Sequence, residues 1–66
     1  MRVHVNGAER ELPEGATVSH LLTALHIDST QVAVEVNSRV VRRASHAERV
    51  LAEGDIVEVV TFVGGG

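Results

Sequence analysis

Apolar residues that recur at every second position constrain the fold of this chain more than any other feature of its sequence. Val32, Val34 and Val36 alternate with Ala33 and Glu35, which is the period of a β-strand with one buried face and one solvated face. The same period recurs in other short stretches. We therefore predict five strands, over residues 1–5, 8–12, 32–36, 39–41 and 56–63.

Turn residues separate the predicted strands. Asn6-Gly7 predicts a two-residue type I′ hairpin turn, because both central positions of that turn need a positive φ. Asn37-Ser38 and Glu53-Gly54-Asp55 predict two further turns, since these residue types favour them. Pro13-Glu14-Gly15 ends the second strand.

A single helix is predicted between the second and third strands. Val18, Leu21, Leu22 and Leu25 fall at i, i+3, i+4 and i+7, which is one stripe of an amphipathic helix. Thr17 precedes the stripe and is the expected N-cap. One helix across a sheet whose strands each have one apolar face is a two-layer α+β arrangement.

Other segments have weaker patterns. Residues 28–30 are predicted to form a polar loop, and residues 42–52 have no clear period beyond a short helical turn near 45–49. We expect one domain over residues 1–63 and a flexible C-terminal tail over residues 64–66, because Gly64-Gly65-Gly66 has no side chains.

Composition excludes several kinds of chemistry. The 66 residues include no cysteine, which excludes disulfides, thiolate metal sites and a cysteine nucleophile. All six basic residues are arginines, so a lysine Schiff base is excluded as well. A net charge of −3 and a single aromatic residue argue against nucleic acid as a partner. No apolar run has the length of a transmembrane helix, and we expect no membrane contact and a cytoplasmic location.

Residues that could bind a metal or catalyse a reaction are scattered. The four histidines lack metal-ligand spacing, and they are His4, His20, His26 and His46. Alternation places Glu9 and Glu11 on one outward strand face, which favours a solvated surface over a general acid–base pair. We therefore expect no metal site and no catalytic residue, and a domain this small has little room for a ligand pocket.

A basic cluster is one candidate for contact with a partner. Arg42 and Arg43 lie close in sequence to Arg39 and Arg49. Such a cluster is either a solvated patch or a docking patch for an acidic surface, where complementary charge would mainly raise the association rate.

The final strand is a second candidate. Val57 and Val59 are expected to face the core, since Glu58 between them must face water. Continuing the period places Val60 and Phe62 on the outward face, and exposed apolar side chains often mark an interaction site. The alternative is a β-bulge that turns Phe62 back into the core.

The α-carboxylate of Gly66 is the one unusual reactive group. Three successive glycines have no Cβ atoms, so such a segment can pass through a narrow channel into the active site of a partner. This is the logic of an acyl carrier whose reactive group is its own C-terminus. The alternative is an inert end.

Four segments of the chain resemble the ThiS family, the sulfur carrier proteins of thiamine biosynthesis. They are residues 17–22, 32–37, 54–60 and 61–66, with the sequences TVSHLL, VAVEVN, GDIVEVV and TFVGGG. The resemblance covers nearly the whole chain. One departure lies in residues 41–44, VRRA, where the family often has a proline-containing segment.

The resemblance implies a β-grasp, ubiquitin-like fold, with the first and last strands paired in parallel at the centre of a mixed five-stranded sheet. It also implies a carrier and not an enzyme. A ThiF-type adenylating enzyme would use ATP and magnesium to form an acyl-adenylate at Gly66, while Gly64 and Gly65 thread into its active site. A persulfide donor such as a cysteine desulfurase would convert the adenylate to a thiocarboxylate. Thiazole synthase (ThiG) would then take the sulfur, with Val60 and Phe62 in the docking surface.

Two other functions stay open on the sequence. A molybdopterin-synthase small subunit, or a carrier for another sulfur pathway, shares the fold and the glycine end, so the fold cannot separate them. A β-grasp interaction module with an inert tail is the alternative from a different class.

Overall fold

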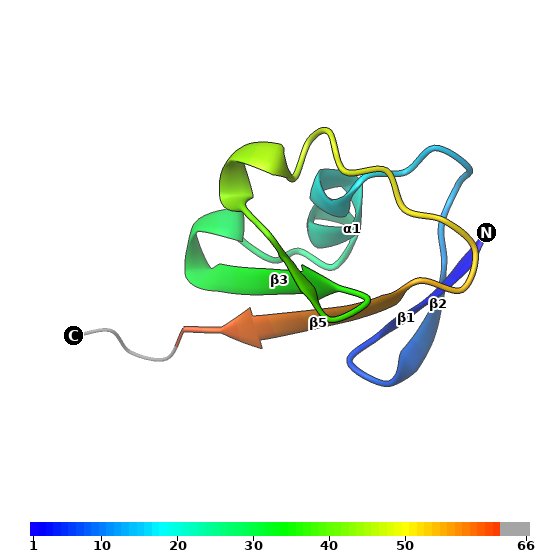
Figure 1. The fold of residues 1–66 in the computed structure, drawn as a ribbon, viewed down its shortest axis with the longest axis horizontal. Coiled ribbons are helices and arrows are strands. Elements are labelled where there is room, and N and C mark those ends of the chain that lie inside the picture. The colour runs from blue at the N-terminus through cyan, green and yellow to red at the C-terminus, as the bar shows by residue number, and fades with distance from the viewer. Residues whose placement is uncertain (63–66) are drawn as a thin grey trace.

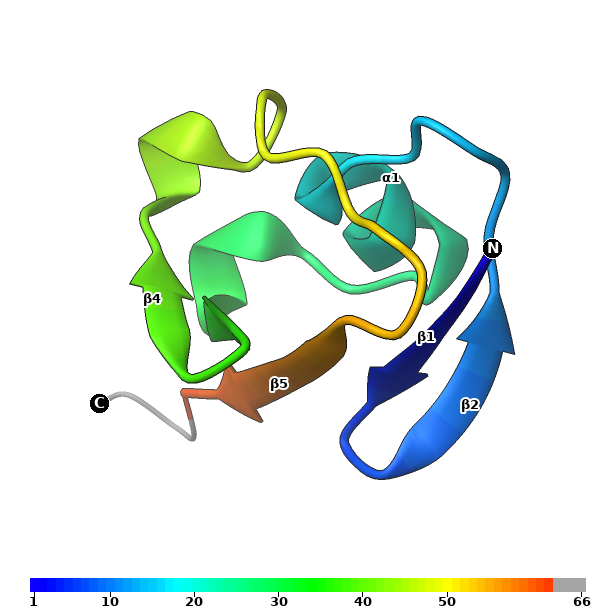
Figure 2. The same cartoon turned by 45° about the vertical axis from the view of Figure 1, so that its right-hand side comes forward.

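A five-stranded mixed sheet with one α-helix across it forms the protein (Figures 1 and 2). The computed structural model describes residues 1–62. The strand order in the sheet is β2-β1-β5-β3-β4. The elements are β1 Arg2–Val5, β2 Ala8–Glu11, α1 Val18–Ala24, the 3₁₀ turn η1 Ser29–Gln31, β3 Val32–Val36, β4 Arg39–Val41, the 3₁₀ turn η2 Arg43–Ser45 and β5 Ile56–Thr61.

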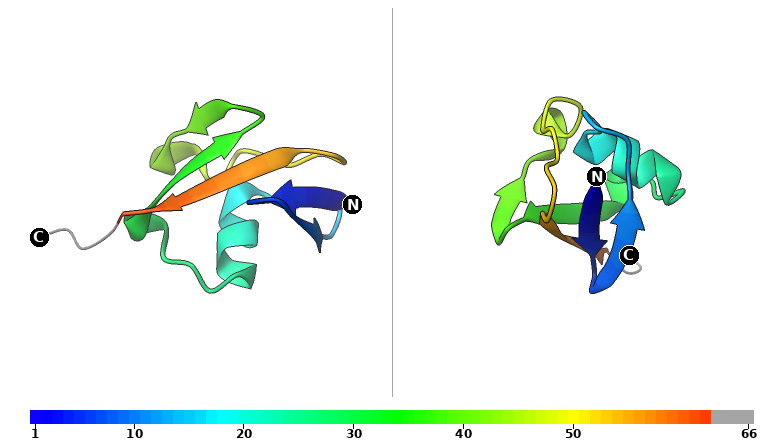
Figure 3. Two further views of the ribbon diagram at one scale, coloured as in Figure 1. Left: turned by 90° about the horizontal axis from the view of Figure 1, so that it is seen from below. Right: turned by 90° about the vertical axis from the view of Figure 1, so that its right-hand side faces the viewer.

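The predicted strands and their central pairing are confirmed. β1 and β5 run parallel, with His4 opposite Ile56 and Val5 opposite Val57. β5 is antiparallel to β3 on its other edge, and it crosses the length of the molecule between β3 and the β1–β2 hairpin (Figure 3). This is the β-grasp arrangement. Residue 63, the predicted end of β5, lies outside the described residues.

The core lies between the sheet and α1. Val57 and Val59 face it as predicted, at 0% and 8% exposed. The helical stripe is buried at Val18, Leu21 and Leu22, while Leu25 is the C-cap and only partly buried. β2 differs from the other strands because all four of its residues are exposed. It is an edge strand, and its charged side chains protect that edge from further pairing.

The hairpin turns form as the asparagines predict. Asn6 and Gly7 have φ values of 49° and 85°, the left-handed conformation that a type I′ turn requires. Asn37 and Ser38 repeat it at 53° and 70°.

Thr17 caps α1 as predicted, and His20 completes the cap. The Thr17 hydroxyl accepts a hydrogen bond from the His20 main-chain N–H at 3.2 Å, and His20 Nδ1 accepts one from the Thr17 N–H at 3.0 Å. Glu or Gln more often fills the role of His20, so the sequence did not indicate this reciprocal cap.

Two segments differ from the prediction. Residues 29–31 form the turn η1 where a loop was expected, because the Asp28 carboxylate caps it by accepting from the Thr30 N–H at 2.9 Å. In segment 42–52, the predicted turn near 45–49 is present, since the Ser45 carbonyl accepts from the main-chain N–H groups of Glu48 and Arg49. The 3₁₀ turn η2 at residues 43–45 was not predicted. Tertiary contacts set this segment: the buried His46 ring contacts the Val41 carbonyl through Nε2 at 3.1 Å.

Candidate functional site

The sheet face opposite α1, here called the outer face, exposes apolar side chains. Val60 is 56% exposed and Phe62 is 58% exposed, so the alternative in which a bulge returns Phe62 to the core is wrong. Ile56 and Val40 are exposed on the same face. Neither residue was among the predicted site residues, although the alternation that buries Val57 also exposes Ile56.

Two carboxylates interrupt the apolar residues of the outer face. Glu35 on β3 lies directly opposite Glu58 on β5, and Val40 on β4 lies opposite Glu35 from the other side. Neither carboxylate makes an ion pair with any group in residues 1–62. Like charges opposite one another in a sheet are destabilising. The outer face is therefore apolar with an uncompensated acidic centre.

The chain leaves the sheet beside this face. The Phe62 N–H donates to the Gln31 carbonyl at 2.8 Å, which continues the β3–β5 ladder to the last described residue. β5 points away from the N-terminus, toward the opposite end of the molecule (Figure 1). The predicted site residues Gly64, Gly65 and Gly66 lie outside the described residues.

The predicted basic residues lie elsewhere. Arg42 is the N-cap of η2 and Arg43 is its first residue. Both are exposed, and neither makes an ion pair within residues 1–62. η2 lies at the level of α1, away from the outer face (Figures 1 and 2). The structure therefore does not bring Arg42 and Arg43 together with Val60 and Phe62.

One titratable group near the basic residues is perturbed. The pKa of Asp28 lies below its ordinary value, chiefly because its carboxylate accepts hydrogen bonds from the Thr30 N–H and hydroxyl at 2.9 and 2.7 Å. The positive charge of Arg43 lowers this pKa further. Asp28 is fully exposed, and this cluster contains no converging catalytic groups.

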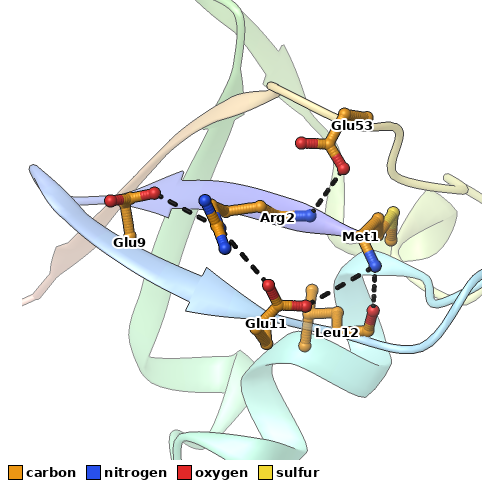
Figure 4. A network of polar contacts seen from close by, with 6 residues as sticks. All are labelled: Met1, Arg2, Glu9, Glu11, Leu12 and Glu53. Carbon is orange, nitrogen blue, oxygen red and sulfur yellow. Dashed lines mark hydrogen bonds and ion pairs between the residues drawn. The ribbon is translucent and has the colours of Figure 1, made fainter.

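The acidic strand residues contact an arginine (Figure 4). Arg2 Nε lies 3.4 Å from Glu9 Oε2 and 3.3 Å from Glu11 Oε1. The main-chain N–H of Arg2 also donates to Glu53 Oε1 at 2.9 Å. The solvated face expected for Glu9 and Glu11 is confirmed, and its charges are largely compensated.

A cleft lies between the β2–α1 loop and α1. Its volume is about 390 Å³, so the expectation that the domain has little room for a pocket is wrong. Its lining is mainly apolar, and its one histidine, His20, already caps α1 through Nδ1.

Within residues 1–62, no group of three or more His, Asp or Glu side chains has an arrangement that holds a metal. No helix in that part of the chain has the length and apolar character needed to cross a membrane.

Comparison with known proteins connects this geometry to a family. A model of the ThiS family matches residues 3–66. The chain belongs to the ThiS family. The match to the ThiS model extends through the terminal glycines, beyond the last residue of the described structure.

Individual ThiS proteins resemble the chain over its whole length. The sulfur carrier protein ThiS of Thermus thermophilus is 36% identical over 97% of this chain and 98% of its own. The crystal structure of a ThiS thiamine biosynthesis protein from Geobacter metallireducens superposes with a TM-score of 0.85, at 35% identity and with both chains fully covered. The Thermus thermophilus relative is named as a sulfur carrier protein.

A further relative is much longer. A thiazole synthase of Paramagnetospirillum magneticum is 42% identical over all 66 residues of this chain, which correspond to 20% of that protein. The chain therefore spans about a fifth of that relative's length.

Proposed function

We propose that this protein is a sulfur carrier of thiamine biosynthesis that carries sulfur as a thiocarboxylate on Gly66. The observation that carries the proposal is the ThiS match through residue 66. The outer face beside the end of β5 supports it, because a carrier must dock on an enzyme while its C-terminus reaches the active site.

The chemistry takes place in partners. An adenylating enzyme with ATP and magnesium joins the Gly66 carboxylate to AMP and releases pyrophosphate, which converts a poor leaving group into a good one. The terminal sulfur of a persulfide displaces AMP, which leaves an acyl disulfide to the donor. A thiol then attacks the donor's sulfur and forms a new disulfide with it, which releases the thiocarboxylate. The carrier contributes presentation, and the active site of the partner contributes proximity. The carrier itself binds no cofactor in this scheme.

Thiazole synthase is the proposed acceptor of the sulfur. Two relatives named thiazole synthase each contain a stretch similar to the whole of this chain. That arrangement supports a shared reaction for the carrier and the synthase. The named relatives are ThiS proteins and thiazole synthases, which favours the thiamine carrier over the molybdopterin-type carrier and the inert module.

Docking is assigned to two surfaces. Val60 and Phe62 on the outer face are the proposed contact with the enzyme that receives the tail, because they are exposed, apolar and close to the point where the chain leaves the sheet. Arg42 and Arg43 lie on a separate surface, which we assign to steering toward an acidic partner surface.

The test is the mass of the protein after incubation with a ThiF-type enzyme, ATP, magnesium and a persulfide donor. We expect exchange of one oxygen for sulfur, and fragmentation must place it on Gly66, because oxidation of Met1 gives nearly the same mass gain. The matched control is the chain without Gly66, which should show no gain. An unmodified Gly66, with an enzyme that modifies the Thermus thermophilus carrier, would contradict the proposal.

A further inference from the structure

Two asparagine side chains hold β5 from its opposite edges. Asn6 follows β1, and its Oδ1 accepts from the Val59 N–H at 2.8 Å while its Nδ2 donates to the Val59 carbonyl at 3.1 Å. Asn37 follows β3, and its Oδ1 accepts from the Ile56 N–H at 3.0 Å. Both residues have a positive φ, 49° and 53°. Asn37 holds β5 at its start, and Asn6 holds β5 near its end.

The Asn6 amide extends the β1–β5 ladder by one step. The main chain supplies the earlier steps, in which the His4 N–H donates to the Asp55 carbonyl and the Asn6 N–H donates to the Val57 carbonyl, both at 2.9 Å. The next residue of β5 on this edge is Val59, and the side-chain amide takes the place that a further strand residue would fill.

Beyond Val59 this edge of β5 is open. The Asn37 N–H donates to the Ile56 carbonyl and the Phe62 N–H donates to the Gln31 carbonyl, so the even-numbered residues of β5 bond to β3. Alternation then directs the main-chain groups of Thr61 toward the β1 side. There β1 has already turned away at Asn6-Gly7, and within residues 1–62 no hydrogen bond joins the Thr61 main chain to that side.

We propose that Asn6 is a positioning residue that fixes the direction in which β5 leaves the sheet, and with it the presentation of the tail. Without its amide, the end of β5 would be held by β3 alone. A two-stranded ribbon twists more strongly than a sheet and is only marginally stable. A smaller fraction of molecules would then present the chain end correctly, and the apparent affinity for the enzyme would fall by that fraction. This inference rests on the proposed function.

The test compares Asn6→Gly with Asn37→Gly. Glycine accepts the positive φ of both turns, so each variant removes the side-chain contacts without backbone strain. The readout is ATP–pyrophosphate exchange by a ThiF-type enzyme with the carrier as the varied substrate, together with the urea midpoint and hydrogen exchange at the Val59 amide. We expect Asn6→Gly to raise the KM for the carrier about tenfold, the effect of about one net hydrogen bond, with kcat unchanged. Asn37→Gly should lower the urea midpoint while leaving KM near the wild-type value.

Asn6→Asp is a partial rescue variant: one carboxylate oxygen keeps the acceptor for the Val59 N–H, while the other replaces the donor and faces the Val59 carbonyl oxygen without a hydrogen bond. Its KM should fall between those of the wild type and Asn6→Gly. If Asn6→Gly and Asn37→Gly change KM equally, the role of Asn6 is purely structural and the inference is wrong. If the wild-type carrier supports no exchange, both the proposed function and this inference are wrong. If the wild type is active and Asn6→Gly has an unchanged KM, only this inference is wrong.

Discussion

Asn37 donates a hydrogen bond from Nδ2 to Asp55 Oδ1 at 2.9 Å, and this joins two turns that lie 18 residues apart. Asp55 is buried, and its other oxygen accepts from the Ala52 N–H at 2.8 Å. Asn37 uses its own oxygen to hold the Ile56 N–H. The β3–β4 turn and the turn before β5 are therefore one polar unit, with the start of β5 fixed between them.

Removal of the Asp55 carboxylate should destabilise the protein. Asp55→Ala leaves the Ala52 N–H and the Asn37 amide without their acceptor. We expect a loss of about 2–3 kcal/mol in the free energy of unfolding, measured by urea denaturation. Glu48→Ala, an exposed control, should stay within about 0.5 kcal/mol of wild type. An equal effect of both substitutions would contradict the role of the polar unit.

Gly54 should resist substitution for a backbone reason alone. Its φ is +84°, and a Cβ atom there would meet nothing within 4 Å. Gly54→Ala should therefore cost about 1–2 kcal/mol through the left-handed conformation, while Gly54→Asn should cost less because Asn tolerates it. Thermal unfolding of both variants tests this order, and the reverse order would show that a steric contact dominates.

The carboxylate of Asp28 should titrate below its ordinary pKa. The main cause is the hydrogen bond from the Thr30 N–H, followed by the one from the Thr30 hydroxyl. Desolvation raises the pKa slightly, and the charge of Arg43 has the smallest lowering effect. Since the folded pKa is depressed, the stabilisation is present above the unfolded pKa and is lost as the pH falls through the folded one. In an NMR titration, Thr30→Val should raise this pKa more than Arg43→Gln does. A larger effect of Arg43→Gln would assign the shift to charge.

Relief of the carboxylate pair on the outer face should stabilise the free protein. Glu58→Gln removes one of the two like charges on Glu58 and Glu35. We expect a gain of about 0.2–1 kcal/mol in the free energy of unfolding, smaller at high salt. Glu14→Gln makes the same charge change in the β2–α1 loop and should have no comparable effect. Equal gains would point to net charge instead of the pair.

Phe62 should matter for binding and not for folding. Phe62→Ala removes an exposed side chain, so the free energy of unfolding should change by less than about 0.5 kcal/mol, while binding to the proposed adenylating partner should be weaker. Val57→Ala, at a fully buried position of β5, should instead cost about 2 kcal/mol or more. Calorimetric titration with the enzyme measures the binding, and undiminished affinity of Phe62→Ala would remove it from the docking surface.

The sequence predicted the elements whose pattern is local. In β3 and α1, the spacing of the apolar residues predicts which face is buried. In the two turns, asparagine itself favours the positive φ that the backbone adopts. β2 was found through its hairpin turn, since an edge strand with four exposed residues has no apolar period.

Segment 42–52 was not predicted beyond the turn near 45–49, because tertiary contacts set the rest of its structure. His46 is 3% exposed, and Val50 forms an isolated antiparallel bridge with Thr17. No period of a few residues encodes such contacts. The same holds for the candidate site. The alternation of β5 predicted that Val60 and Phe62 are exposed, whereas only the structure shows that Arg42 and Arg43 lie on a different surface.

The position of β5 has a consequence for synthesis of the protein on the ribosome. β5 lies between β1 and β3, and these two strands do not pair with each other. Until β5 has been translated, the nascent chain lacks the strand that lies between the β1–β2 hairpin and the β3–β4 hairpin. A polypeptide truncated before β5 therefore cannot complete the sheet, because it lacks the strand that joins β1 to β3.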